Sequence, residues 1–116
     1  MNKKMKDKLI VVLRTLINIE KTHKLCEFGA MSDMVNTLED IAVHESDCSD
    51  SLPENMLFGK RGERYMLNAA ELTSAAHTLS KVAEEMRTAI TINAKLAVDF
   101  KEINKARMAV KHCIDR

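Results

Sequence analysis

The chain has 116 residues, of which 46% are hydrophobic and 30% are charged, and its formal net charge is +1. This balance is typical of one soluble globular domain and excludes a wholly disordered chain. No apolar run approaches the roughly 20 residues that cross a bilayer, so we expect a cytoplasmic protein with no membrane partner. The three cysteines are odd in number and far apart, which argues against a disulfide framework.

The kinds of hydrophobic residue indicate the fold class. There are eight Met but only three Phe, one Tyr and no Trp, and three Gly and one Pro are the only strong helix breakers. Unbranched side chains such as Met, Leu, Lys and Glu lose little rotamer freedom in a helix. We therefore predict an all-α protein in which residues 1–116 form a single helical domain.

Charged residues are segregated along the chain. Residues 1–24 hold seven basic and two acidic side chains, and residues 25–59 hold eight acidic side chains with no Lys or Arg. Residues 60–116 hold eleven basic and seven acidic side chains. An acidic block of this kind either docks a basic partner, pairs with the protein's own basic ends, or is solvated.

The first predicted helix covers residues 3–27. Its apolar positions alternate three and four apart, which is the spacing of a helix-packing surface. Gly29 is the predicted left-handed cap after this helix, and Ser32 is the predicted N-cap of a second helix that fades near Glu45. The two helices are expected to form an antiparallel hairpin over residues 1–45.

Residues 46–62 form the predicted loop. Ser, Asp, Asn and Gly concentrate there, together with Pro53, which disfavours helical geometry at the residue before it. The basic side chains Lys60, Arg61 and Arg64 follow at the end of this stretch. We expect a connector between two helical halves rather than a catalytic loop.

From residue 63 almost to the C-terminus the chain contains no Gly or Pro and carries one apolar stripe in heptad-like register. Positions on this stripe include Leu72, Leu79, Met86, Asn93, Phe100 and Ile103. A single helix over residues 63–116 would extend about 80 Å and leave its stripe uncovered, so it would pair with a second copy as a coiled coil.

A break near residues 91–93 would instead close a four-helix bundle within one chain. Because the stripe keeps its phase across this junction, the sequence favours the unbroken helix and a homodimer. Asn93 is then predicted to be a buried polar residue that sets the register of the helical pair.

Two pairs of residues offer metal ligands, His23 with Cys26 and His44 with Cys48. Histidine and cysteine are the ligand types of structural zinc sites. In a helical hairpin the two pairs would lie about 20 Å apart along the axis. We therefore predict that they do not form one zinc site, and that the protein uses no metal and no cofactor.

Arg107 and His112 form the spacing Arg-x-x-x-x-His. It resembles the motif of HEPN-type ribonucleases, small helical dimers that place such a pair at the subunit interface to act on an RNA phosphate. The resemblance covers this motif and the fold class, and Met108 stands where that family usually has a polar residue. So permissive a spacing often arises by chance, and the sequence favours two ordinary surface residues and no catalytic site.

Together these patterns favour a non-enzymatic helical modulator that binds another protein through an acidic surface, which would imitate a polyanion. The predicted partner-binding residues are Glu39, Asp40, Glu45, Asp47 and Asp50. Small, Met-rich chains with segregated charge are frequent among phage and mobile-element proteins that inhibit or retarget a host complex, so a host protein partner is expected. One alternative is a nucleic-acid-binding regulator that uses basic residues 3–8 and 60–64. A second alternative is the ribonuclease activity that the HEPN resemblance implies.

Overall fold

The computed structural model describes residues 1–91 and 99–116, in which every regular element is a helix and none is a strand. The helices are α1 (Lys3–Thr22), α2 (Phe28–Asp50), α3 (Glu54–Leu57), α4 (Lys60–Thr91) and α5 (Phe100–Asp115). The prediction of an all-α protein is confirmed. None of these helices combines the length and the apolar character needed to cross a membrane.

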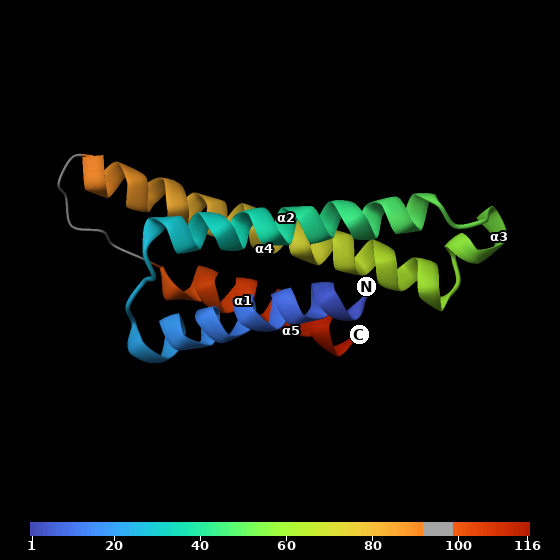
Figure 1. Ribbon diagram of the computed structural model, residues 1–116, viewed down its shortest axis with the longest axis horizontal. Helices are drawn as coiled ribbons and strands as arrows, with labels where there is room; N and C mark the ends of the chain where they lie inside the picture. The colour runs from blue at the N-terminus through green and yellow to red at the C-terminus, as the bar shows by residue number, and fades with distance from the viewer. Residues whose placement is uncertain (92–98) are drawn as a thin grey trace.

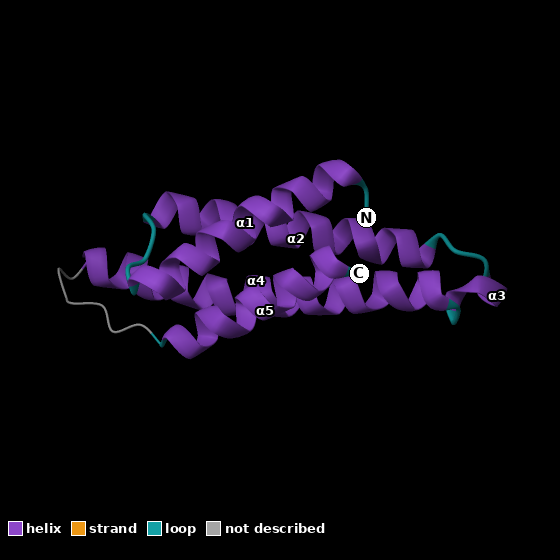
Figure 2. Ribbon diagram, turned by 90° about the horizontal axis from the view of Figure 1, so that it is seen from below, coloured by secondary structure: helices purple, strands orange, loops and turns teal. Residues whose placement is uncertain are grey.

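The four long helices form an antiparallel bundle, in which each helix runs opposite to its neighbours (Figure 1). The longest pair, α2 and α4, packs along most of its length, while α1 and α5 form a shorter pair on one side of it (Figures 1 and 2). The bundle is elongated, with extents of 54 × 24 × 23 Å. The start of α1 and the end of α5 lie near each other, beside the first half of α4.

A single cluster of apolar side chains fills the centre of the bundle, and all four long helices contribute to it. Its fully buried members include Leu9, Leu16 and Ile19 of α1, Met31 and Leu38 of α2, Leu72 and Leu79 of α4, and Ile103 and Val110 of α5. Each such side chain stabilises the fold by about 1.5–3 kcal/mol on leaving water.

The first helix is shorter than predicted and ends differently. It stops just before His23, which adopts the left-handed conformation (φ 54°, ψ 31°) and donates its backbone N–H to the last turn of α1. The predicted cap residues Gly29 and Ser32 instead lie inside α2, which begins at Phe28. Histidine is one of the few residues besides glycine that is enriched in this conformation. The His23 ring also packs edge to face on Phe100, with centroids 5.0 Å apart.

Most of the predicted loop over residues 46–62 is helical. The C-terminal turn of α2 extends into it, the short helix α3 follows Pro53, and α4 begins at Lys60. Ser and Asp are poor helix formers, but Glu45 and Ser49 are buried in this part of α2. Tertiary packing therefore outweighs local propensity here.

The unbroken helix predicted for residues 63–116 is not observed. One helix ends at Thr91, and α5 begins at Phe100 and runs back along α4 and α1 (Figure 1). Asp99 caps the start of α5, because its side chain accepts a hydrogen bond from the backbone N–H of Lys101 at 2.9 Å. The alternative prediction of two helices fits this arrangement. Asn93, the predicted register residue, lies outside the described residues.

The apolar stripe that led us to expect a homodimer is covered within one chain. Leu72, Leu79, Met86 and Ile103 are buried, and Phe100 packs half-buried against the core. Packing the two halves of the stripe together within one chain costs only the entropy of closing one loop. Pairing two chains costs translational and rotational entropy. The homodimer remains a prediction, but the exposed stripe on which it depended is absent from the described part of the chain.

Candidate functional site

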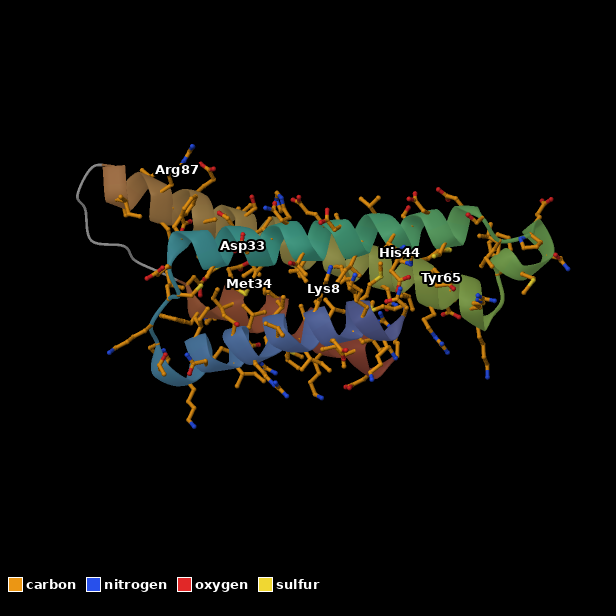
Figure 3. All side chains as sticks on the ribbon, in the orientation of Figure 1. Lys8, Asp33, Met34, His44, Tyr65 and Arg87 are labelled. Atoms are coloured by element: carbon orange, nitrogen blue, oxygen red, sulfur yellow. The ribbon has the colours of Figure 1, made fainter. Side chains whose placement is uncertain are left out.

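The outer face of α2 carries exposed carboxylates. Asp33, Asp40 and Asp47 are seven residues apart, so they lie on one side of the helix, and Asp50 follows near its end. Glu39 lies beside them; we call these five residues the acidic row, whose first member is labelled in Figure 3. All five are exposed, and none forms an ion pair with any other residue that the structure describes.

An apolar spot lies within the acidic row. Val43 falls between Asp40 and Asp47 on the same face, and 60% of it is exposed. Beside it lies a groove of about 590 Å³ between α2 and α4. The groove is lined by Glu39, Ala42, Val43, Ser46, Ala69, Ala70 and Thr73. An apolar centre with a charged rim is the usual composition of a protein-binding patch.

The charged side chains at the C-terminal end of α2 and the N-terminal end of α4 have the sign that interacts unfavourably with the helix dipole. Asp47 and Asp50 lie in the last turn of α2, and Lys60 and Arg61 lie in the first turn of α4. Lys60, Arg61 and Arg64 are thus exposed helical residues rather than the basic loop that we predicted. A charge of the unfavourable sign costs about 0.3–1 kcal/mol at an exposed helix end. Asp47 and Arg61 line one pocket between these helix ends.

Glu45 does not belong to the acidic surface, contrary to the prediction. It lies four residues after Ile41, on the core side of α2, and is fully buried. Its Oε1 accepts a hydrogen bond from Asn68 Nδ2 at 2.9 Å, and the α-amino group of Met1 lies 3.5 Å from the same oxygen. Its other oxygen, Oε2, is buried and has no hydrogen-bond partner in the described part of the chain.

Asn68 links Glu45 to the end of α5. The Asn68 Oδ1 atom accepts a hydrogen bond from Arg116 Nη1 at 3.0 Å, and Arg116 Nη2 lies 2.9 Å from Glu71 Oε1. Burial raises the pKa of Glu71, but the hydrogen bond and charge of Arg116, together with nearby His112, outweigh burial and hold that pKa below its usual value. The four side chains tie α2, α4 and α5 together.

Cys113 lies against this network and is not a reactive thiol. It is buried, with its Sγ 3.7 Å from Glu71 Oε2. Burial and the negative charge of Glu71 raise the pKa of the Cys113 thiol to about 12. The thiolate, which is the nucleophilic form, is therefore scarce at neutral pH.

No spacing pattern in the sequence pointed to Asn68, Glu71 or Arg116. One signal was present, because Asn68 occupies an inward position four residues before Leu72, where a polar side chain needs a buried partner. Its partners, however, lie 23 and 48 residues away along the chain. Helical periodicity relates residues three or four positions apart, so it cannot reveal contacts over such separations.

The two His–Cys pairs lie at opposite ends of α2. His23 and Cys26 precede the helix, whereas His44 and Cys48 lie in its last two turns, with Nε2 and Sγ 3.5 Å apart. About 24 Å of helix separates the pairs, so the four residues do not converge.

Arg107 and His112 also do not share a site. Arg107 pairs with Glu20 of α1, whereas His112 Nδ1 lies 3.7 Å from Glu71 of α4. Residues five apart point in directions about 140° apart on a helix. Within one chain, the structure therefore places the two members of the HEPN-like spacing against different neighbours.

Comparison of the chain with models of protein families, with curated proteins and with solved structures finds no match. The function is therefore argued from the surface itself, on which the acidic row, Val43 and the adjoining groove form one accessible patch.

Proposed function

We propose that this chain is a non-enzymatic binding protein that holds a basic segment of a host protein against the outer face of α2. The observation that carries the proposal is the exposed acidic row around Val43. Carboxylates at the rim steer a basic partner and fix its register, and an apolar centre supplies the buried area. The fitting partner is a Lys- or Arg-rich segment with an apolar side chain that enters the groove beside Val43.

The competing explanation is that the protein's own basic residues neutralise the acidic row. Several of them have other partners in the described part of the chain: Arg87 pairs with Glu84, Lys105 with Glu102, Arg107 with Glu20, Lys111 with Asp115, and Arg116 with Glu71. The carboxylates of the row form no ion pair within the described residues, which leaves them available for another molecule. This supports an intermolecular role.

The same surface suits an inhibitor or adaptor of a host complex, of the phage or mobile-element type that we expect from the sequence. Carboxylates spaced along one side of a straight helix form a line of negative charge, as a phosphate backbone does. If the partner is a nucleic-acid-binding protein, double-stranded DNA should compete with this chain for it.

A capture experiment followed by charge reversal tests the proposal. The chain is used to capture a partner from the native host, the partner is identified by mass spectrometry, and binding is then measured with both proteins purified. We expect the double variant Asp40→Lys/Asp47→Lys to weaken binding at least about tenfold, which is about 1.4 kcal/mol. Binding to the unmodified chain should also weaken as salt is added.

Glu85→Lys is the matched control, because Glu85 is an exposed carboxylate on α4 outside the acidic row. It should leave the affinity within about twofold, as expected for a charge outside the interface. Equal losses in both variants, or full binding by the double variant, would refute an acidic-row interface.

A second candidate, nucleic-acid binding, is favoured by one observation. The polar contacts of Met1 and Arg116 bring the start of α1 and the end of α5 to the first half of α4, so residues 3–8 and 60–64 gather in one half of the bundle. Binding of DNA or RNA that falls steeply with salt, and that Lys3→Glu/Arg64→Glu abolishes, would favour this candidate over the first.

A further inference from the structure

His44, Glu45 and Cys48 gather three different metal-ligand types in the last two turns of α2. One ligand atom from each lies within 4.8 Å of the others. The closest pair is His44 Nε2 and Cys48 Sγ, 3.5 Å apart. Zinc bonds of about 2.1 Å to nitrogen and 2.3 Å to sulfur at a tetrahedral angle would place these two atoms about 3.6 Å apart. The pair therefore already has the separation of two zinc ligands.

Glu45 supplies the second, independent observation. It is fully buried, and Oε1 is occupied by Asn68 Nδ2 and by the α-amino group of Met1. Among the residues that the structure describes, the buried Oε2 has no hydrogen-bond partner. A weak thiol–imidazole hydrogen bond accounts for the contact between His44 and Cys48, but it leaves this oxygen unpaired. A cation bound by all three residues accounts for both observations.

We propose that His44, Glu45 and Cys48 form a binding site for one Zn²⁺ ion. Imidazole, thiolate and carboxylate are the zinc ligands of proteins, whereas Ca²⁺ and Mg²⁺ select sites made of oxygen atoms alone. On binding, the Cys48 thiol loses its proton to solvent and neutral His44 donates the Nε2 lone pair. The Glu45 carboxylate supplies the third ligand.

Two of the three proposed ligands are reached from a surface pocket. His44 and Cys48 line this pocket of about 370 Å³, together with Asp47, Arg61 and Tyr65 among others. His44 on α2 and Tyr65 on α4 are both labelled in Figure 3, and the pocket lies where these two helices face each other. Arg61 donates a hydrogen bond to the Tyr65 hydroxyl at 3.1 Å. Three protein ligands with one accessible position are typical of zinc that also holds water or an incoming ligand.

Direct metal binding tests the site. The full chain, with no residues added before Met1 and no polyhistidine tag, is titrated with ZnCl₂ by calorimetry and with Co²⁺ by absorption spectroscopy. We expect one equivalent of zinc, a proton released on binding, and a thiolate-to-cobalt charge-transfer band. The melting temperature should rise as zinc is added.

Three single variants and one matched control locate the site. Cys48→Ser, His44→Gln and Glu45→Gln should each weaken zinc binding more than about tenfold, since loss of a group that only orients a ligand already weakens metal binding by about tenfold or more. Cys26→Ser is the control, because it removes a thiol from the other His–Cys pair and should bind zinc like the unmodified chain. Circular dichroism and urea denaturation establish that each variant is folded before its affinity is compared.

Several results would overturn the site. These are no binding of zinc at micromolar concentration, unchanged affinity in any of the three folded site variants, or a loss of affinity in Cys26→Ser equal to that in Cys48→Ser. Should one of the site variants be unfolded, the zinc affinities of the other two decide, and unchanged affinity in either folded variant refutes the site.

Discussion

Asn68 is the residue at which the polar contacts of three helices meet. It donates to Glu45 on α2, accepts from Arg116 at the end of α5, and is itself buried on α4. Buried polar groups are costly when unpaired, so the contact with Glu45 restricts how α2 packs on α4, and the contact with Arg116 restricts how α5 docks. Arg116 extends the network to Glu71, whose carboxylate it holds in the charged form.

Arg116→Gln should therefore lower stability in a pH-dependent way. The pKa of Glu71 is lower in the folded state than in the unfolded chain, so the contribution of Arg116 is present above the ordinary carboxyl pKa of about 4.3 and is lost as the pH falls through the lowered folded value. We expect the free energy of unfolding to fall by about 1 kcal/mol at pH 7 and by less towards pH 3. Urea denaturation at both pH values measures it.

Lys111→Gln is the control for this prediction, because Lys111 pairs with Asp115 and both side chains are more than half exposed. That variant should change the free energy of unfolding by less than about 0.5 kcal/mol. A loss in Arg116→Gln that is as large at pH 3 as at pH 7 would show that the pairing with Glu71 contributes nothing.

The corner between α3 and α4 depends on a close approach of backbone atoms at Gly62. This residue lies in the first turns of α4 and is buried, and a Cβ atom added to it would overlap the carbonyl group of Leu57. Gly62 thus lets α3 fold back against α4. Elsewhere in a helix, alanine would be favoured over glycine by about 1 kcal/mol.

Gly62→Ala should consequently destabilise the protein in spite of the higher helix propensity of alanine. We expect a loss of about 1–3 kcal/mol, because the overlapping atoms belong to the Leu57 backbone and must move together. Gly29→Ala in α2 is the opposite case, since nothing lies within 4 Å of the added Cβ, and it should stabilise by about 0.4–1 kcal/mol. Thermal and urea denaturation measure the change in the free energy of unfolding for each variant. A stabilising effect of Gly62→Ala would contradict the close approach.

At the scale of the whole molecule, one chain buries the apolar faces of its four long helices. Core residues come from α1, α2, α4 and α5 alike, and α5 packs on both α4 and α1. The acidic row lies outside this core, on the solvent side of α2. The four long helices therefore share one apolar interior, and the acidic row lies outside it.

We accordingly expect a single chain in solution. Light scattering at micromolar concentration should report about 13.1 kDa, and small-angle scattering should report an elongated particle with a radius of gyration slightly above the Cα value of 15.4 Å. A mass twice as large would support the homodimer predicted from the sequence. It would also require a contact surface other than the buried Leu72–Leu79 side of α4.

Much of the fold could be predicted from the sequence. The helical class follows from scarce Gly and Pro, and the inward position of Leu72, Leu79 and Ile103 follows from their spacing. The direction of α5 could not be predicted from the spacing of the apolar residues. The same spacing fits one continuous helix and two helices that pack antiparallel. The Asp99 N-cap with Glu102 three residues later was the local signal for a new helix.

By itself, then, the sequence determined the helical class, the apolar faces and the segregation of charge, since each depends on composition or on residues a few positions apart. Only the tertiary structure decided that α5 folds back, that Glu45 points inward while Asp40 and Asp47 remain exposed, and that Asn68 meets Arg116. These outcomes depend on which helices become neighbours. Contacts between residues distant in the chain produce no repeating pattern in the sequence.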